Sequence, residues 1–171
     1  MILSGYLIQK YNLVYPFNES QLNPNSYNMR LGPTIKMLNE TIVVPNMEQR
    51  YVDFKLPYTL QPGELYLGHT IERSNPSTNF VPMIEGRSSF ARLGLTVHLS
   101  AGFGDVGFRG QWTLEFTTVK PFVLEPGVEI CQIFFVEVKQ PVMDVYRGRY
   151  QNQEGAVGSR YHLPSGQDSV G

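Results

Sequence analysis

Residues 85–115 read EGRSSFARLGLTVHLSAGFGDVGFRGQWTLE, and no other stretch of the chain is so dense in chemically active side chains. Its end runs into QWTLEFT at 111–117, where apolar and polar side chains alternate. A period of two is that of a β-strand, so Trp112, Leu114 and Phe116 are predicted on one face and Glu115 on the other. A glutamate on the polar face of a strand is ordinarily solvated. The alternation therefore fixes the direction of Glu115 and leaves its role open.

Residues 87–94, RSSFARLG, predict one or two helical turns that begin at a serine cap and end at Gly94 in a left-handed conformation. Ser88 and Arg92 are four residues apart and share one face of such a helix. Serine hydroxyls, guanidinium groups and the free N–H groups of a helix start would together suit a phosphate. A surface helix with solvated arginines is the other interpretation, and the spacing alone favours it.

The rest of the sequence extends the strand pattern of residues 111–117. Short alternating runs recur about every ten residues, and 16 glycines and 12 prolines separate them. Pro-Gly turns at 62–63 and 126–127 each lead into a further run, and residues 131–138 are the most apolar of these. This spacing predicts an all-β barrel or sandwich, with 131–138 as a central strand. Residues 1–13 contain Ser4 before an apolar-periodic segment, which predicts one short helix.

Bulk composition limits the classes of function. A chain of 171 residues suits one domain. With 14 basic and 15 acidic residues, its net charge of −1 indicates neither a nucleic-acid binder nor a membrane-surface binder. The single cysteine, Cys131, excludes an intrachain disulfide and excludes the zinc-deaminase signature, which needs a Cys-x-x-Cys pair. No signal peptide or membrane-length apolar run is present, so a soluble cytoplasmic protein is expected.

Ordered motifs along the chain resemble those of the dCTP deaminase family, the deaminating relatives of the trimeric dUTPases. The resemblance rests on EGRSSFARLGL at 85–95, on Val97-His98, on the Ala101-Gly102…Asp105 loop and on Thr113-Leu114-Glu115. Three other regions agree with the family, namely MILS at 1–4, NPNSYNMRLG at 23–32 and the segment 146–160. The likeness covers residues 1 to about 160. It implies a distorted jelly-roll β-barrel of the dUTPase type with a few short helices, a C-terminal arm at about 141–160 and a flexible tail at 161–171.

The resemblance also implies an activity, removal of the 4-amino group of dCTP without zinc. It makes Glu115 the catalytic carboxylate and places Asp105 at the deoxyribose and near an attacking water. Mg2+ would be held through the substrate phosphates, dTTP is a candidate inhibitor, and a homotrimer with sites shared between subunits is expected. His98 would influence the conformation of the site, although a hydrogen-bonded strand histidine is an equally good interpretation. The remaining substrate contacts that the resemblance implies are Arg87, Ser88, Ser89, Phe90, Ala91, Arg92, Thr113, Leu114, Gln132, Tyr146, Arg149 and Gln153.

Three features resemble the family members that continue from dCTP to dUMP and pyrophosphate and so supply dUMP for thymidylate synthesis. These features are Gly102-Phe103, Gln132 and the short link from Tyr146 to Tyr150. A glycine at 102 is expected to leave space for a water beside Asp105. A deaminase that releases dUTP, a pure dUTPase and a non-catalytic nucleotide-binding regulator remain as alternatives.

The sequence departs from the family pattern in the loop and in the arm. Gly104 stands where a branched apolar residue is usual, which predicts a looser loop. Val106 replaces a common proline, and Arg149 replaces a usual lysine, which keeps the charge and alters the geometry of phosphate contact.

Overall fold

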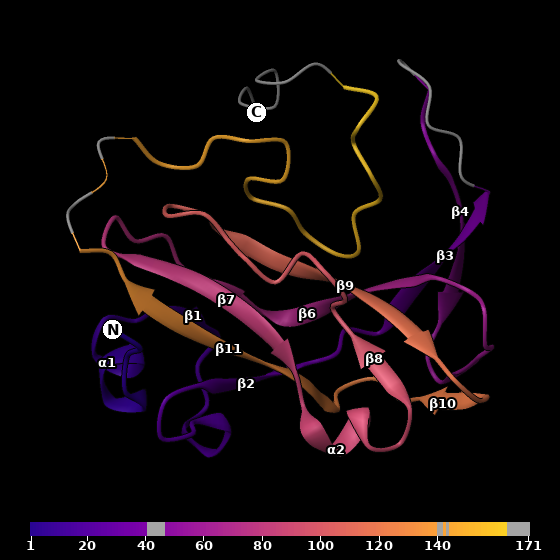
Figure 1. The fold of residues 1–171 in the computed structure, drawn as a ribbon, viewed down its shortest axis with the longest axis horizontal. Coiled ribbons are helices and arrows are strands. Elements are labelled where there is room, and N and C mark those ends of the chain that lie inside the picture. Colours follow the sequence, from indigo (N-terminus) through magenta and orange to yellow (C-terminus); the bar gives the residue numbers. More distant parts are fainter. Residues whose placement is uncertain (41–46, 140–141, 143, 164–171) are drawn as a thin grey trace.

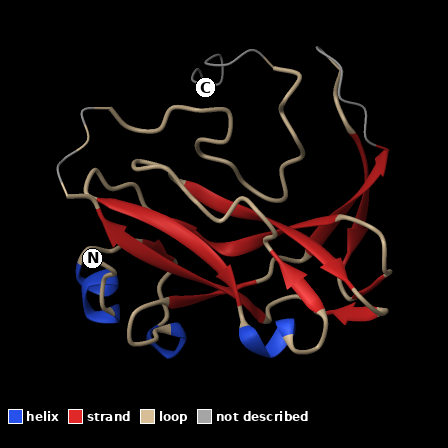
Figure 2. Cartoon of the chain, in the orientation of Figure 1, coloured by secondary structure: helices blue, strands red, loops and turns tan. Residues whose placement is uncertain are grey.

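In the described part of the chain, antiparallel strands form two main sheets, and three short helices lie at the edges of the fold (Figures 1 and 2). The computed structural model describes residues 1–40, 47–139, 142 and 144–163. The larger sheet has the order β4(Arg50–Lys55), β3(Thr34–Glu40), β6(Tyr66–Ser74), β9(Gly110–Thr118), β8(Leu95–Val97), with β1(Val14–Tyr15) paired to β6. The second sheet has the order β2(Tyr27–Arg30), β11(Glu129–Glu137), β7(Phe80–Gly86), and β10(Phe122–Leu124) pairs with β5(Tyr58–Leu60). The helices are α1(Gly5–Lys10), the 3-10 turn η1(Glu19–Gln21) and α2(Ser88–Ala91).

The expected all-β class with a few short helices is confirmed. The apolar run at 131–138 forms most of β11, the central strand of its sheet, as its composition predicts. Helix α1 begins directly after Ser4, although the Ser4 side chain makes no capping hydrogen bond. Residues 41–46, and the part of the predicted flexible tail beyond residue 163, lie outside the described residues. None of the helices in the described ranges is long and apolar enough to cross a membrane.

The two main sheets enclose one apolar core. Tyr27, Phe135, Phe116 and Tyr66 are among its largest wholly buried side chains, and they come from both sheets. Cys131 is also wholly buried in this core, and burial raises the pKa of its thiol. The thiol therefore stays protonated and packs as a small apolar group.

A buried carboxylate fastens the sheets to each other. Glu72 on β6 is fully buried, and its oxygens accept hydrogen bonds from the backbone N–H of Arg30 at 2.7 Å and from Nε of Arg30 at 2.6 Å. Nε2 of Gln21 donates to the same carboxylate at 3.0 Å. The hydrogen bond to Glu72 raises the pKa of the Arg30 guanidinium. The β6 register shifts between His69 and Arg73, and this irregularity carries Glu72 toward β2.

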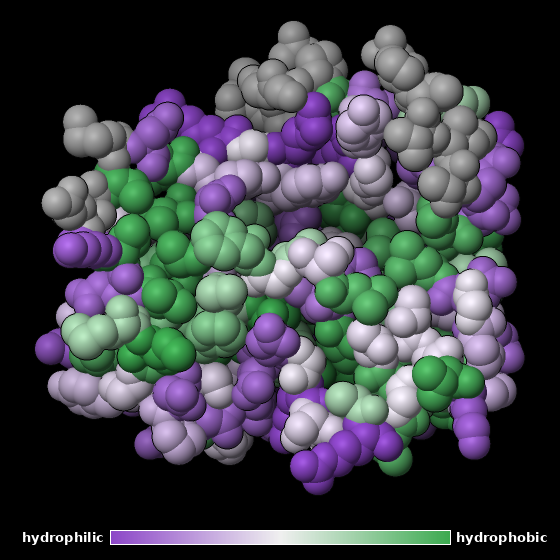
Figure 3. All heavy atoms as spheres, in the orientation of Figure 1, coloured by the Kyte–Doolittle hydropathy of each residue, from purple (hydrophilic) through white to green (hydrophobic). Residues whose placement is uncertain are grey.

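The outer face of the β2-β11-β7 sheet carries apolar side chains that no described element covers completely. Val81 and Met83 on β7 and Phe134 and Val136 on β11 are half-buried there. Figure 3 shows apolar side chains gathered over these two strands. A face of this kind is suited to packing against another protein surface.

The burial of Glu72 predicts that two ion pairs of similar length contribute very differently to the free energy of unfolding. Glu72→Ala should lower the free energy of unfolding by about 3 kcal/mol, because it leaves buried donors without an acceptor. Asp53→Ala removes the partner of Lys36 in a pair of 2.7 Å whose aspartate is 71% exposed, and should cost less than about 1 kcal/mol. Chemical denaturation at one protein concentration measures both values. Equal losses would show that Glu72 is not a structural tie.

Candidate active site

A pocket of about 480 Å3 lies over β9, between the loop at 101–105 and the C-terminal arm. Its walls bring together seven of the residues that the family resemblance assigned to the site. These are His98, Phe103, Asp105, Thr113, Glu115, Tyr146 and Gln153. Glu115 points away from the aromatic face of its strand as the alternation predicts, and its side chain is 24% exposed.

Glu115 faces His98 at the base of this pocket. Nδ1 of His98 lies 3.3 Å from Oε2 of Glu115, which is within ion-pair range if the imidazole is protonated. The His98 side chain is only 3% exposed and meets the Trp112 ring edge-on. Both ring nitrogens of His98 and Oε2 of Glu115 are buried without a hydrogen-bond partner in the described chain. Buried polar atoms that face one another in this way are suited to a bound molecule that completes their hydrogen bonds.

His98 also opens the edge of β9. Its backbone φ of 62° is left-handed, and β8 ends one residue before it, at Val97. The His98 N–H still donates to the Glu115 carbonyl at 2.8 Å, so peptide groups at Glu115, and two residues away at Thr113, point to the β8 side. From Glu115 back toward Gly110, this edge of β9 has no neighbouring strand among the described residues. The peptide groups of Thr113 therefore face the pocket.

Leu114 does not share this position. Its side chain is fully buried, and the alternation turns its peptide groups toward Gly68 of β6. The structure therefore brings the backbone of Thr113, and not that of Leu114, to the pocket.

The loop at 101–105 runs close beside β7, which corrects two expectations. The Gly102 carbonyl accepts from the Ile84 N–H at 2.8 Å, and a Cβ at Gly102 would lie 2.5 Å from the Ile84 carbonyl oxygen. The glycine therefore permits a close backbone approach and does not leave space for a water. Gly104 is buried, and its N–H donates to the Pro82 carbonyl at 2.9 Å. The expectation that Gly104 loosens the loop is therefore wrong.

Asp105 follows this fixed stretch and remains exposed in the pocket wall. Its carbonyl accepts from the Phe108 N–H at 3.1 Å, which begins a turn. Val106 is buried next to it, and the Val106 carbonyl accepts from the Tyr146 N–H at 2.8 Å. The departure from proline at 106 therefore coincides with the point where the arm joins the loop.

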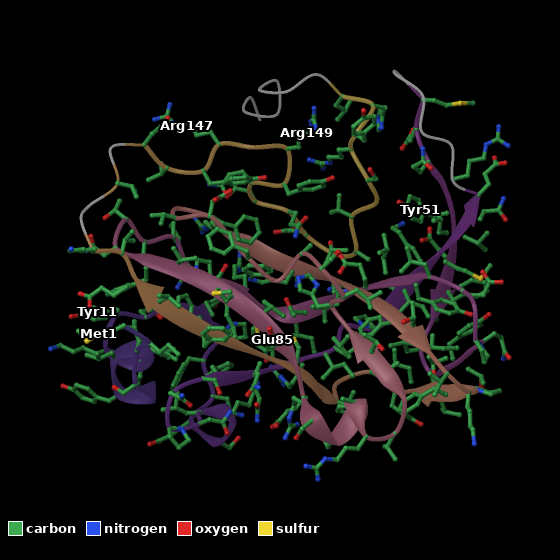
Figure 4. The ribbon with its side chains drawn as sticks, in the orientation of Figure 1. Met1, Tyr11, Tyr51, Glu85, Arg147 and Arg149 are labelled. Carbon is green, nitrogen blue, oxygen red and sulfur yellow. The ribbon has the colours of Figure 1, made fainter. Side chains whose placement is uncertain are left out.

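The C-terminal arm packs over β9 of the same chain (Figure 1). The Gln111 N–H donates to the Gln153 carbonyl at 3.0 Å, and Nε2 of Gln153 donates to the Gln111 carbonyl at 2.7 Å. The arm thus occupies the open edge of β9 next to Thr113. Tyr146 packs against Phe108 with ring centroids 5.8 Å apart, and its hydroxyl accepts from the Tyr150 N–H at 3.2 Å. Arg149 lies on the arm near the top of Figure 4 and is not part of the pocket wall.

Residues 155–159 continue from the arm across the pocket, and we call them the strap. Alternate N–H groups of the strap donate to side chains of the sheet. Gly155 donates to Oε1 of Gln111 at 2.6 Å, Val157 to Oγ1 of Thr113 at 3.1 Å, and Ser159 to the hydroxyl of Tyr51 at 3.0 Å. The strap therefore forms part of the roof over Glu115.

The predicted phosphate clamp, Arg87 to Arg92, lies on a different part of the molecule from the pocket. Helix α2 is at the bottom of Figure 1 and the arm is at the top. Ser88, Ser89, Ala91 and Arg92 are exposed and Phe90 is half-buried, and none of these residues lines the pocket that holds Glu115. Gln132 belongs to the same region, because it pairs with Glu85 in β7.

The start of α2 differs from the expected serine cap. Arg87 occupies the N-cap position, and its side chain makes no capping hydrogen bond. Its Nη1 instead donates to the Glu129 carbonyl at 2.8 Å and to the Glu129 carboxylate at 3.2 Å. Gly94 has the predicted left-handed conformation, with φ of 87°.

The pocket has an acidic lining. Glu115 and Asp105 contribute carboxylates, and no Lys or Arg is present among the described residues that line it. In the described part of the chain no group of three or more His, Cys, Asp and Glu side chains could hold a metal ion.

Several pocket residues were not predicted from the sequence. Tyr51, Leu67, Trp112, Tyr150 and Val157 all contribute to its walls. Leu67 pairs with Glu115 across β6 and β9, and a register between the two strands would have found it. Tyr51 carries no local signal, since its contact with Ser159 spans 108 residues of sequence.

Comparison with known proteins adds one family and one fold. A family model described as dCTP deaminase-like matches residues 3–138. A protein of Cytophaga hutchinsonii described as a dUMP-forming dCTP deaminase is 46% identical, with 91% of this chain and 93% of the relative covered. A protein of Clostridium acetobutylicum with the same description is 43% identical over the same shares of both chains. The crystal structure of 2'-deoxycytidine 5'-triphosphate deaminase from Agrobacterium tumefaciens superposes with a TM-score of 0.64 at 19% identity. It covers 78% of this chain and 47% of that chain, and shows a shared fold.

The packing of Gly104 predicts that this position does not accept a side chain. A Cβ there would lie 2.5 Å from the Trp112 ring and 3.0 Å from Pro82, so Gly104→Ala should lower the free energy of unfolding by about 1–3 kcal/mol. The emission of Trp112, the single tryptophan, should shift with it. Ser100→Ala, at an exposed position of the same loop, is the matched control and should change stability by less than about 0.5 kcal/mol. If Gly104→Ala left the free energy of unfolding unchanged, the loop would accept a side chain at 104, as the looser loop expected from the sequence requires.

Proposed function

Because the chain belongs to the dCTP deaminase-like family, we propose that it deaminates dCTP at cytosine C4 and then hydrolyses the nucleotide to dUMP and pyrophosphate. The observation that carries the proposal is the meeting of Glu115, Asp105 and the open Thr113 edge in one pocket. Relatives described as dUMP-forming dCTP deaminases support both steps. The single buried cysteine is in keeping with work in the cytoplasm, where the product would supply dUMP for thymidylate synthesis.

Glu115 is the general acid and base of the first step. It takes a proton from a water that attacks C4 and gives it to N3, and it then moves the proton of the new C4 hydroxyl to the departing amine as the C4 carbonyl forms. A C–O bond forms, the C–N bond breaks, and ammonia leaves. The buried Oε2 beside His98 has no competing hydrogen bond in the described chain, so the carboxylate is available to substrate. The peptide groups of Thr113, two residues before Glu115, are in position to hydrogen-bond the base.

The second step breaks the bond between the α-phosphorus and the oxygen that leads to the β-phosphate. Asp105 is the carboxylate available to orient the attacking water, since it lies exposed in the same wall. Mg2+ would be held through the substrate phosphates, where it would neutralise charge, and such an ion usually needs no cage of protein ligands. Tyr146 and Gln153 close the pocket from the arm side.

The acidic lining implies that a second subunit completes the site. A triphosphate carries several negative charges and requires cations, whereas the described lining of the pocket contributes only carboxylates as charged side chains. The clamp at Arg87 to Arg92, whose Ser88, Ser89 and Arg92 are exposed, lies with the half-buried Gln132 on another part of the surface. A trimer in which each clamp meets a neighbouring pocket would bring the two halves together. The uncovered apolar face of the β2-β11-β7 sheet is the surface suited to such an interface.

The direct test incubates purified protein with dCTP and Mg2+ and identifies the products by chromatography. We expect dUMP, pyrophosphate and ammonia in equal amounts. Accumulation of dUTP without pyrophosphate would instead identify a deaminase only, and turnover of dUTP without turnover of dCTP a pure dUTPase. Binding of the nucleotide with no product would indicate a regulator, and dTTP added to the same assay would reveal inhibition.

Mixing two inactive variants tests the shared site. Glu115→Gln should lower deamination by about 10²–10⁴-fold, because the amide cannot shuttle protons. Arg92→Ala should weaken triphosphates far more than nucleosides, since it removes charge-assisted hydrogen bonds. Subunits of the two variants mixed at random into trimers should regain activity at about a quarter of the sites. Native mass spectrometry provides the control, and mixed trimers without recovered activity would refute the shared site.

A further inference from the structure

We propose that Tyr51 is a positioning residue that fastens the far end of the strap across the pocket, so that nucleotide enters and leaves when the strap releases Tyr51. The part that concerns the nucleotide rests on the proposed function. Tyr51 lies on β4, and no pattern in the sequence identifies it. In Figure 4 it lies on the same side of the molecule as the arm and far from Tyr11 and Met1.

Two contacts join Tyr51 to the strap. The Ser159 N–H donates to the Tyr51 hydroxyl at 3.0 Å. The Tyr51 ring packs against Gly158 so closely that a Cβ at 158 would collide with ring carbons. Tyr51 thus holds two adjacent strap residues, one through its hydroxyl and the other through its ring.

The strap is attached to two different strands. At its near end Thr113 and Gln111 of β9 accept its N–H groups, and at its far end Tyr51 of β4 does so. In the sheet, β3 and β6 lie between these two strands. Because Gly155 and Val157 are both bonded to β9, the crossing is made by the two steps from residue 157 to 159, which cover about 7 Å when extended. The strap therefore does not span the floor alone, and the Tyr51 side chain meets it from the opposite side.

The floor beneath the strap contains the proposed chemistry. Leu67 of β6 pairs with Glu115 of β9, and both side chains line the pocket with Tyr51 and Val157. Two of the three hydrogen bonds of the strap are made to β9 and one is made to β4. Gln111 and Thr113 hold the strap on the β9 side, and Tyr51 holds it on the opposite side. Release of Tyr51 would therefore loosen the far end from β4 while the near end stays attached, and Arg160, the next residue, would remain joined to the arm through its N–H to the Tyr150 hydroxyl at 3.1 Å.

The strength of the Tyr51 contact suits a fastening that must open in each catalytic cycle. One neutral hydrogen bond contributes modestly to stability, so its loss should change the ratio of open to closed strap by about two- to tenfold. Lids that open between turnovers often limit substrate capture or product release without touching the reacting atoms.

The first test uses Tyr51→Phe, which removes the hydroxyl and keeps the ring. Trypsin cleavage after Arg160, which follows the strap, should become about two- to tenfold faster, because cleavage tracks the open population. Cleavage after Lys10, at an exposed position of α1, is the internal reference. The KM for dCTP should rise by a similar factor while kcat stays the same or increases. Tyr11→Phe, at a tyrosine in contact with Phe80 and distant from the strap, is the matched control.

A second test does not depend on the hydroxyl. Gly158→Ala should also speed cleavage after Arg160, because the new methyl group pushes against the Tyr51 ring. In a Tyr51→Ala background the same substitution should add nothing, since the ring is gone. Acrylamide quenching of Trp112, which lines the pocket, reports the same opening.

Cleavage and quenching decide the proposal independently of enzyme activity. Wild-type cleavage in Tyr51→Phe, or additive effects of Gly158→Ala and Tyr51→Ala, would overturn the fastening role. If the wild-type protein does not turn over dCTP, the proposed function fails, and the cleavage rates still decide whether Tyr51 holds the strap. Faster cleavage with unchanged KM would show that the strap opens freely but does not control the nucleotide, which overturns the second half of the proposal.

Discussion

The candidate site depends on one interruption of strand pairing. The chain turns at His98, in a left-handed conformation, and β8 therefore ends while β9 continues. Half of one edge of β9 is left without a strand, and three features use that edge. The arm takes it at Gln111, the Thr113 peptide groups face the pocket, and Glu115 emerges beside the histidine that causes the turn. Had β8 continued, regular pairing would have filled the position of the pocket.

Glycine has a different part in the site from the one the sequence indicates. In the sequence, Gly102 and Gly104 suggest a flexible loop backbone, whereas in the structure both are closely packed against neighbouring residues. Each allows the loop to lie against β7 with backbone hydrogen bonds, so that Asp105 projects from a fixed base. A sequence shows that a side chain is missing but does not show what fills the space, because the neighbouring atoms come from a distant strand.

Local periodicity predicted much of the fold and only part of the site. The direction of Glu115, the left-handed Gly94, the start of α1 and the central place of β11 follow from patterns within a few residues. The resemblance to a family added Asp105 and the arm, which no periodicity could supply. Contacts between distant segments could not be predicted in this way. The separation of the clamp from the pocket, the burial of Leu114 and the contact of Tyr51 with the strap all depend on how strands pair across the sheet.

The docking of the strap has a consequence for the tolerance of the arm to substitution. Its three hydrogen bonds are donated by peptide N–H groups at 155, 157 and 159, whereas the acceptors are side chains of the sheet. The side chains at 157 and 159 therefore matter little to these bonds, and proline is excluded there because it has no N–H. Gly155 has a left-handed φ of 68° and Gly158 packs against the Tyr51 ring, so these two positions favour glycine. Gln111, Thr113 and Tyr51 have no such freedom, because their own functional groups accept the bonds. Sequence drift at residues 157 and 159 can thus alter the roof of the pocket while its attachment persists.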